Sequence, residues 1–274
     1  MRKKINLLNA DEYLWKLKKN RLGNEDICLT FDDALLCQSD VALPILSSEN
    51  ISAFFFVYSS PLMGKPDLLE VYRFFRNEKF RNVDEFYSAF FDFVERNHTS
   101  EIDVAKLKYQ KNTYLSAFPF YTENDKWFRF LRDETLGSEI YAEVMRSLML
   151  KHNFSQKEVL TKLWMNNSHV KTLHDNGHFV GLHSHNHPTT MHKLSVEKQK
   201  VEYDTNFQHL TAIIGQKPIS MSHPCGNYNE VTIEILKKLG IEIGFRSSLS
   251  VPHAKSNLEI PRQDHANVLT EMEK

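Results

Sequence analysis

The stretch Ile27-Cys28-Leu29-Thr30-Phe31-Asp32-Asp33 decides how the rest of the chain is interpreted. Ile27 to Phe31 is a short apolar run with one threonine, a pattern typical of a buried β-strand. The run stops at two adjacent carboxylates, and strands of α/β proteins present functional groups at their carboxyl ends. Successive side chains point in different directions, so one acid can hold a cation while the other accepts a proton. A solvated loop or a helix N-cap also suits these aspartates, and this stretch alone does not separate the interpretations.

The composition fits a globular chain and argues against several classes of protein. The 274 residues are 41% hydrophobic and 25% charged, with a formal net charge of -1, which suits one domain or one domain with a large insertion. A near-neutral charge gives no support for a nucleic-acid partner. Three irregularly spaced cysteines are too few for a disulfide framework. No apolar run is long enough to cross a bilayer, and the basic N-terminus lacks the apolar stretch of a signal peptide. We therefore expect no integral membrane segment and a cytoplasmic location.

Strands and helices alternate at both ends of the chain. Ile51 to Tyr58 is a continuous apolar run, typical of a strand buried on both faces, and a short helix is predicted before it at residues 41–46. The alternation returns with a strand at residues 178–182 and a helix that begins near Ser195 and ends at Gly215. Strand, helix and strand in this order predict right-handed crossovers and a parallel sheet, the α/β class. Further strands are predicted at residues 218–222, 241–245 and 258–262, with a helix ending at Gly240 among them.

Between about residues 60 and 175 the hydrophobic periodicity becomes helical, and most of the phenylalanines lie here. We interpret this region as a helical insertion into a single catalytic domain that spans residues 1–274. Aromatic stripes on such helices can contact a lipid carrier or a membrane surface, but they are more often core, and we favour core. The stripe of one predicted helix consists of Val83, Phe86, Tyr87, Phe90 and Val94.

Three histidines lie within five residues after the predicted strand at 178–182. They are His183, His185 and His187. Imidazole is a good ligand for zinc and similar divalent ions, and an open catalytic site uses three protein ligands plus water. His183 and His187 with one carboxylate of the aspartate pair would make a His₂Asp set. A single histidine would indicate a solvated turn, whereas three together after a buried strand favour a metal site.

With both motifs in place, the sequence resembles the polysaccharide deacetylases, metal-dependent carbohydrate esterases that remove N- or O-acyl groups from sugars. Thr30-Phe31-Asp32-Asp33 resembles the first motif of the family, and His183-Ser184-x-x-His187 resembles its second, H-[S/T]-x-x-H. The resemblance covers roughly the first sixty residues and everything from Asn176 onward. It implies a distorted (β/α) barrel of the polysaccharide deacetylase type with the site at the carboxyl ends of the strands, here interrupted by the large helical insertion.

The resemblance also implies a role for each motif residue. Asp33, His183 and His187 would bind one divalent metal ion, with zinc (Zn²⁺) expected. Asp32 would be the general base, and the ion would stabilise the developing oxyanion. Ser184 would support its loop by hydrogen bonding.

Two departures from the family pattern concern the partners of the base. The glycine that usually follows the two acids is Ala34 here. The third motif, R-x-P-x-G, reads Ser222-His223-Pro224-Cys225-Gly226, so its arginine is absent. We predict that Arg262 supplies the missing charge beside Asp32, since closure of the barrel would bring the last strand next to the first. The alternative is a surface arginine paired with Asp264.

A third departure leaves the general acid open. The late L-x-I-x-H motif that provides this acid has no clean match, and His265 and His223 are the candidates. A surface position is the alternative for His265. From the altered third motif we assign His223, Pro224 and Gly226 to substrate binding.

These assignments predict a metal-dependent hydrolase that removes an acetyl or formyl group from the nitrogen of a sugar. A nucleotide- or lipid-linked precursor of cell-surface polysaccharide or lipopolysaccharide is the expected substrate. Two alternatives stay open, namely hydrolysis of a non-sugar C–N (amide) bond and a catalytically inactive, carbohydrate-binding homologue. The sequence leaves the oligomeric state undefined.

Overall fold

A parallel sheet organises one part of the chain, and a helical segment interrupts it. The computed structural model describes residues 5–116, 121–247, 255–265, 267 and 268. Residues 1–67 and 160–274 form one compact unit, the sheet unit, and residues 68–159 form a second, the helical unit. The boundaries of the helical unit lie inside the predicted insertion at about 60–175. The organisation of residues 1–274 as a single catalytic domain stays a prediction.

The main sheet has the strand order β3-β4-β5-β6-β7-β8, and every pairing in it is parallel. The sheet curls into a half-barrel whose two edge strands are β3 and β8, which confirms the predicted α/β class. All its carboxyl ends lie along one edge, because parallel strands run in the same direction. The strands are β3 (Thr30–Phe31), β4 (Phe54–Val57), β5 (Phe179–Leu182), β6 (Ser220–Ser222), β7 (Ile243–Arg246) and β8 (Ile260–Pro261).

The strand predicted at Ile27 to Phe31 is two short strands instead. β2 (Asp26–Ile27) pairs with β1 (Asn6–Leu7) in a separate two-stranded sheet. β3 begins at Thr30 and pairs with β4. One apolar run thus serves two sheets.

Strand β4 is the centre of the core. Its four residues are completely buried, which confirms that both faces of the strand are covered. Phe55 and Val57 point into one hydrophobic cluster, and Phe54 and Phe56 point into another, because alternate side chains leave opposite faces of a strand. Each buried phenylalanine contributes roughly 2 kcal/mol through removal of its ring from water.

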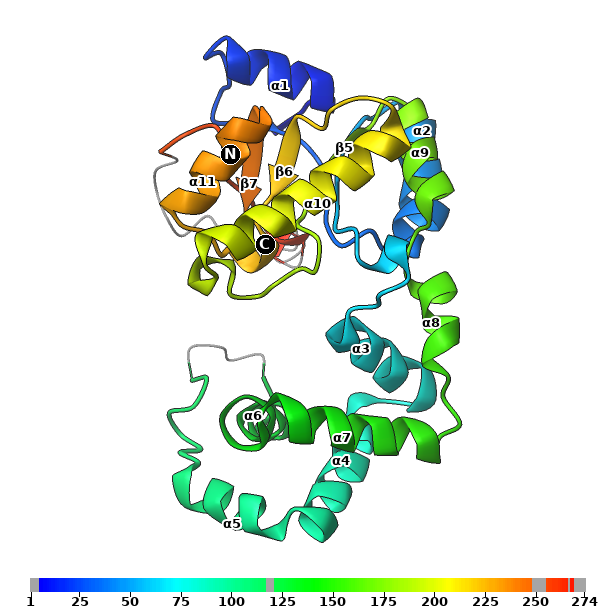
Figure 1. The fold of residues 1–274 in the computed structure, drawn as a ribbon, viewed down its shortest axis with the longest axis vertical. Helices are drawn as coiled ribbons and strands as arrows, with labels where there is room; N and C mark the ends of the chain where they lie inside the picture. Colours follow the sequence, from blue (N-terminus) through cyan, green and yellow to red (C-terminus); the bar gives the residue numbers. More distant parts are fainter. Residues whose placement is uncertain (1–4, 117–120, 248–254, 266, 269–274) are drawn as a thin grey trace. The chain divides into compact units, whose positions relative to one another are not determined.

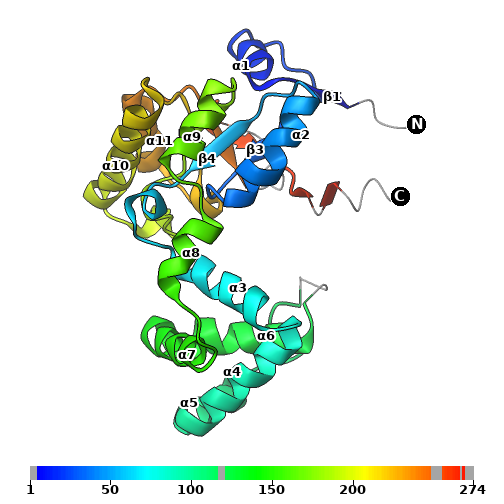
Figure 2. The ribbon, with the colours of Figure 1, turned by 90° about the vertical axis from the view of Figure 1, so that its right-hand side faces the viewer.

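Helices cover both faces of this sheet (Figures 1 and 2). α1 (Ala10–Lys18) contributes Tyr13 and Leu14 to the cluster that holds Phe54 and Phe56. The opposite cluster takes apolar side chains from four helices, and α10 lies beside both α9 and α11. These four are α2 (Leu43–Ser48), which continues a π-helical turn at Gln38–Ala42, and α9 (Asn167–Asp175), α10 (Val196–Ile214) and α11 (Glu230–Leu239).

The ends of α10 and α11 are those that the sequence predicts. The Ser195 side chain accepts a hydrogen bond from the backbone N–H of Lys198 and caps α10. Gly215 and Gly240 end α10 and α11 in the left-handed conformation, with φ of 76° and 82°. Within the sheet, Gly181 of β5 lets the neighbouring strand β6 approach closely. A Cβ atom on it would stand 2.6 Å from the carbonyl oxygen of Ser220.

The helical unit has an aromatic core of its own. The Phe128 ring lies 4.9 Å from the Phe90 ring and 5.5 Å from the Phe86 ring. Phe86, Tyr87, Phe90 and Val94 are buried, which confirms that this stripe is core. No helix in the described part of the chain is long and apolar enough to span a bilayer. The helices are α3 (Leu68–Lys79), α4 (Val83–Asn97), α5 (Thr99–Lys108), α6 (Glu123–Phe130) with a π-helical turn at Leu131–Leu136, α7 (Gly137–Lys151) and α8 (Gln156–Leu163), which crosses the boundary between units.

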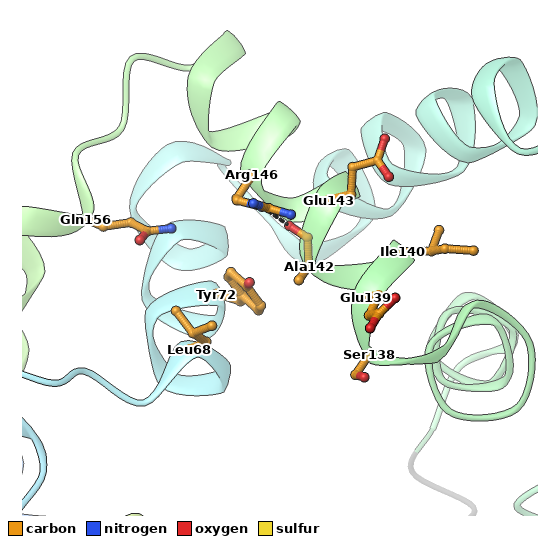
Figure 3. Close-up of a pocket in the computed structure, with 9 residues that line it drawn as sticks. All are labelled: Leu68, Tyr72, Ser138, Glu139, Ile140, Ala142, Glu143, Arg146 and Gln156. Carbon is orange, nitrogen blue, oxygen red and sulfur yellow. Dashed lines mark hydrogen bonds between the residues drawn. The ribbon is translucent and has the colours of Figure 1, made fainter.

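A pocket of about 620 Å³ lies in the helical unit (Figure 3). The ring of Tyr72, 4% exposed, contributes to its wall from α3. Most of the rest comes from α7, where the Nε of Arg146 donates a hydrogen bond to the carbonyl of Ala142. The lining consists of Leu68, Tyr72, Ser138, Glu139, Ile140, Ala142, Glu143, Arg146 and Gln156.

Candidate metal and catalytic site

Charged side chains converge at the carboxyl edge of the main sheet. Asp32 and Asp33 follow β3, His183 follows β5 directly and Arg262 follows β8. His187 lies in the loop after β5. Parallel pairing therefore brings together residues that are far apart in the sequence.

Asp33, His183 and His187 form the tightest cluster. The Oδ1 atom of Asp33 lies 3.3 Å from Nε2 of His183 and 3.4 Å from Nε2 of His187. One ligand atom from each residue lies within 4.8 Å of the other two. His183 is fully buried, whereas the other two side chains are partly accessible. The structure thus places the three predicted metal ligands around one point.

The cluster is electrostatically suited to a cation. Burial by itself would lower the pKa of the His183 imidazole. The carboxylates of Asp32 and Asp33 more than offset burial, and the pKa of His183 is raised. The position where the three ligand atoms meet therefore favours positive charge.

Hydrogen bonds fix the His183 ring and its backbone. Its Nδ1 lies 2.8 Å from the carbonyl oxygen of Ser222. A carbonyl only accepts, so Nδ1 carries the proton and Nε2 presents its lone pair to the cluster. The backbone N–H of His183 donates to Oδ1 of Asn206, whose Nδ2 donates to the carbonyl of Val57. One buried amide from α10 therefore connects the ends of β4 and β5.

The ligand loops adopt left-handed backbone conformations. Asp33 and Ala34 have φ of 76° and 54°, and Ser184 and His187 have φ of 63° and 53°. Such values are rare in residues other than glycine and persist where the surroundings enforce them. Ser184 helps to enforce them, because its Oγ accepts a 3.1 Å hydrogen bond from the backbone N–H of His187. This is the supporting role expected for Ser184.

Arg262 holds Asp32 through both carboxylate oxygens. Its two terminal nitrogens lie 2.8 Å from Oδ1 and 2.6 Å from Oδ2 of Asp32. The same guanidinium also donates to the hydroxyls of Ser222 and Thr30 and to the carbonyl of Arg246, at 2.8, 3.1 and 3.2 Å. A guanidinium that fills its planar fork in this way is fixed in orientation.

The same contacts keep Asp32 ionised. Burial alone would raise the pKa of this carboxyl. The nearby His183 and the hydrogen-bonded Arg262 outweigh burial and hold the pKa of Asp32 below its ordinary value. Oδ2 of Asp32 lies 3.9 Å from Nε2 of His183, at the border of the cluster.

The residues assigned from the altered third motif lie in different surroundings. His223 is completely buried, its Nε2 donates to the carbonyl of Leu258, and its ring stacks on Tyr228. Burial lowers the pKa of His223 to about 4. Pro224 and Gly226 form a short 3₁₀ turn, in which Pro224 is buried and Gly226 has φ of 67°. A buried His223 cannot contact a substrate directly, so the expected binding role does not fit its position.

His265 lies outside the cluster. Its side chain is 89% exposed and its Nδ1 lies 3.3 Å from a carboxylate oxygen of Asp264. His265 therefore has the surface position given above as its alternative, and this position gives no support for a role as general acid. Asp264, in turn, is the residue that Arg262 would have contacted as a surface arginine.

Sequence reasoning missed two residues that hold the histidine loop. Glu202 of α10 accepts hydrogen bonds from the backbone N–H groups of His185 and Asn186, at 3.0 and 2.7 Å. Asn206 lies one turn later on the same helix and is completely buried. Its signal was an amide on the apolar face of the helix, three residues after Tyr203.

The donor set fits a divalent cation. Two imidazole nitrogens and one carboxylate oxygen are the ligand types that zinc and related ions take in catalytic sites. The fixed tautomer of His183 supplies the orienting hydrogen bond that such ligands usually carry. A metal site is therefore compatible with the residues present.

Comparison with known proteins concerns the family and the fold. Residues 145–244 match the family model described as polysaccharide deacetylase, and that range includes His183 and His187. A family model over this segment thus supports the resemblance of the sequence to the polysaccharide deacetylases. Over 125 residues it is also 31% identical to the uncharacterized protein YlxY of Bacillus subtilis, which covers 44% of this chain and 39% of YlxY. The chain therefore matches about two fifths of the length of this curated relative.

Solved deacetylase structures share the fold. A de-N-acetylase from Aggregatibacter actinomycetemcomitans superposes with a TM-score of 0.53 and 13% identity, covering 97% of this chain and 83% of that one. The deacetylase PplD of Streptococcus pyogenes gives 0.50 and 15%, covering 98% and 80%. At these identities the likeness concerns the fold alone, which is the deacetylase-type fold predicted from the sequence.

Proposed function

We propose that the chain is a metal-dependent hydrolase that removes an acetyl or formyl group from the nitrogen of a sugar. The observation that carries the proposal is the meeting of Asp33, His183 and His187 beside a base held by an arginine. The match of residues 145–244 to the polysaccharide deacetylase family model supports an acylated carbohydrate as substrate. A nucleotide- or lipid-linked precursor of cell-surface polysaccharide or lipopolysaccharide is the substrate we favour, and cytoplasmic location stays a prediction.

Three residues would hold the ion and one would handle protons. Asp33, His183 and His187 would hold one divalent ion, with zinc our choice. When bound, such an ion acts as a Lewis acid that polarises an acyl carbonyl and makes a water more acidic. Asp32 accepts the proton of the attacking water, because its carboxylate is ionised and borders the cluster. Once protonated, Asp32 can return this proton to the leaving nitrogen.

Arg262 orients the base. Its two parallel hydrogen bonds leave the Asp32 carboxylate little freedom to rotate, and its charge keeps the carboxylate deprotonated. Arg262→Lys keeps a charge but loses the fork. We expect this variant to bind metal normally and to turn over roughly 10-fold or more slowly, because a misplaced base transfers protons poorly.

The test combines metal content with hydrolysis. Purified wild-type protein should contain about one divalent ion per chain. It should release acetate or formate from N-acylated sugar nucleotides or from N-acetylglucosamine oligomers. Asp32→Asn should keep the ion and lose roughly 10²-fold or more in kcat. His183→Ala/His187→Ala should lose the ion, and His192→Ala, which changes an exposed histidine, should retain both ion and activity.

Other outcomes separate the alternatives. Release of amine from small cyclic amides, with no reaction on sugars, would favour the hydrolase of non-sugar C–N bonds. Oligosaccharide binding without hydrolysis would identify an inactive homologue. If Asp32→Asn loses the ion and Asp33→Asn keeps it, the two acids have exchanged roles. Unchanged metal content in the double histidine variant would refute the site.

A further inference from the structure

The ligand His187 packs against a tyrosine that another residue holds in place. The rings of His187 and Tyr58 lie 5.2 Å apart with an interplanar angle of 40°. Tyr58 is completely buried at the end of β4, and Trp164 is 2% exposed. The indole N–H of Trp164 donates a 2.6 Å hydrogen bond to the Tyr58 hydroxyl, and the two rings meet edge to face. A buried indole that is hydrogen-bonded in this way fixes the tyrosine ring, and with it one wall around the imidazole.

The segment that contains Trp164 also holds the loop of the second ligand. Trp164 forms an antiparallel bridge with Leu35. The backbone N–H of Met165 donates a 2.9 Å hydrogen bond to the carbonyl of Ala34, the residue directly after Asp33. Asp33 and Ala34 have positive φ, so their conformation depends on such contacts. Trp164 and Met165 therefore connect the carboxylate ligand with the wall behind His187.

The second ring nitrogen of His187 lies near a carboxylate. Oδ2 of Asp67 lies 3.9 Å from Nδ1 of His187, while Nε2 of the ring faces Asp33. Both side chains are mostly buried, with 16% of Asp67 and 15% of His187 exposed. A carboxylate near the far nitrogen of a ligand histidine favours the tautomer that leaves Nε2 free to bind. Asp67 is the last residue of the sheet unit before α3, and Trp164 follows α8. One flanking segment therefore lies near His187 itself, and the other contacts its neighbour Tyr58.

We propose that Trp164, Tyr58 and Asp67 are positioning residues that fix the His187 imidazole for metal binding, with Trp164 also aligning the Asp33 loop. The inference rests on the metal site of the proposed function and adds residues outside the deacetylase motifs. It predicts that the two segments of the sheet unit that flank the helical unit in sequence govern metal affinity, although neither contributes a ligand.

The experiment measures zinc affinity by competition with a chromogenic chelator and the absorption spectrum of the cobalt-loaded protein. Asp67→Asn should weaken zinc binding roughly 10-fold, the effect typical of such partners of ligand histidines. Trp164→Phe and Tyr58→Phe should each weaken it several-fold and alter the cobalt spectrum. The double variant Trp164→Phe/Tyr58→Phe should bind zinc no more weakly than whichever single variant binds it less tightly, because both changes remove the same hydrogen bond.

Matched controls distinguish positioning from general loss of stability. Tyr203→Phe removes a hydroxyl from another completely buried tyrosine of the sheet unit, and Trp15→Phe and Asp175→Asn change exposed residues. All three should bind zinc as the wild type does. The proposal is overturned if Asp67→Asn, Trp164→Phe and Tyr58→Phe also bind like wild type, or if their losses only follow a fall in the Tm of the metal-free protein. Absence of zinc binding by the wild type would refute this proposal and the proposed function together, whereas normal wild-type binding with unaffected variants refutes this one alone.

Discussion

The backbone conformation of Ala34 favours glycine, whereas the burial of its methyl group favours alanine. Its φ of 54° is left-handed, which costs a residue other than glycine roughly 1–2 kcal/mol. Its methyl group is completely buried and contributes about 0.8 kcal/mol. A glycine at this position would also destabilise the folded state by about 0.4–1 kcal/mol, because it raises the conformational entropy of the unfolded chain. These effects nearly cancel, which explains how an alanine is tolerated after the two acids.

The first prediction compares two buried alanines. Ala34→Gly should change the free energy of unfolding by less than about 0.5 kcal/mol, because relief of strain offsets the losses. Ala53→Gly loses a methyl that is just as buried at a position without positive φ. It should destabilise by roughly 1.5 kcal/mol. Urea unfolding of both variants measures the difference, and equal destabilisation would show that Ala34 carries no strain.

His223 gives a prediction about acid stability. Its folded pKa is about 4, chiefly because of burial, with His183 and Arg262 lowering it further and the Leu258 carbonyl opposing them. The unfolded pKa is about 6.5, so below this pH the unfolded state binds the proton more readily. Wild-type stability should therefore fall between pH 6.5 and 4, by roughly 3 kcal/mol in total from this group. Above pH 6.5 His223 is neutral in both states, so it adds nothing to the pH dependence of the free energy of unfolding.

His223→Gln removes the titrating group and keeps a side-chain donor for the Leu258 carbonyl. The variant should lose less stability than the wild type as the pH falls from 7 to 4.5, even if it is less stable at pH 7. Urea unfolding of both proteins across this range measures the difference in slope. If the free energies of unfolding of the two proteins fall in parallel with pH, His223 has the same pKa in the folded and unfolded states.

Some residues of the site could be predicted from the sequence pattern around them, and others could not. The aspartate pair and the histidine cluster follow apolar runs, so parallel pairing predicted that they converge. The choice of Asp33 over Asp32 as the metal ligand came from the resemblance to the deacetylases. Arg262 could be placed beside Asp32 because it ends the last predicted strand. Tyr58 and Trp164 gave no such signal, since their meeting depends on a contact between residues 106 positions apart. His265 had the right chemistry but no strand to direct it.

Among the elements, β5 is the strand that leads into the proposed ligand His183, and the position of this strand depends on Gly181. A Cβ there would stand 2.6 Å from the Ser220 carbonyl and 2.8 Å from the Phe56 ring. The carbonyl belongs to the neighbouring strand and cannot move without displacing it. Gly181→Ala should therefore destabilise the fold by about 2 kcal/mol and weaken zinc binding. Gly23→Ala, where the nearest atom is 3.6 Å away, is the control expected to leave both unchanged.

Helix ends were easier to predict than strand limits. Ser195 and Gly215 fix the ends of α10 through contacts within a few residues. The run from Ile27 to Phe31 gave no sign of its division, because Ile27 pairs with Leu7 and Thr30 with Phe54. Only the tertiary partners decide where one strand ends and the next begins.

At the scale of the whole molecule, the change from alternating to helical periodicity predicted the interruption of the sheet. The aromatic stripe of α4 predicted a core, and the unit formed by residues 68–159 has one. The sequence did not reveal that Asp67 and Trp164, which flank that unit in sequence, lie near the proposed ligand His187 and its neighbour Tyr58, respectively.

The last prediction concerns how metal binding is distributed over the chain. A ligand that binds only the folded state stabilises the part of the chain that unfolds together with the binding site. The free energy of unfolding of that part rises by RT ln(1 + [L]/Kd). All three proposed metal ligands belong to the sheet unit, whereas the Phe86, Phe90 and Phe128 cluster gives the helical unit a core of its own. Zinc at about 100 times its Kd should therefore slow amide exchange in the cores of β4, β5 and β6 up to roughly 100-fold where exchange requires unfolding of that unit. Exchange in α4 and α7 should stay unchanged. Hydrogen exchange followed by mass spectrometry measures both sets of peptides at once, and equal slowing in the two would show that the units unfold as one.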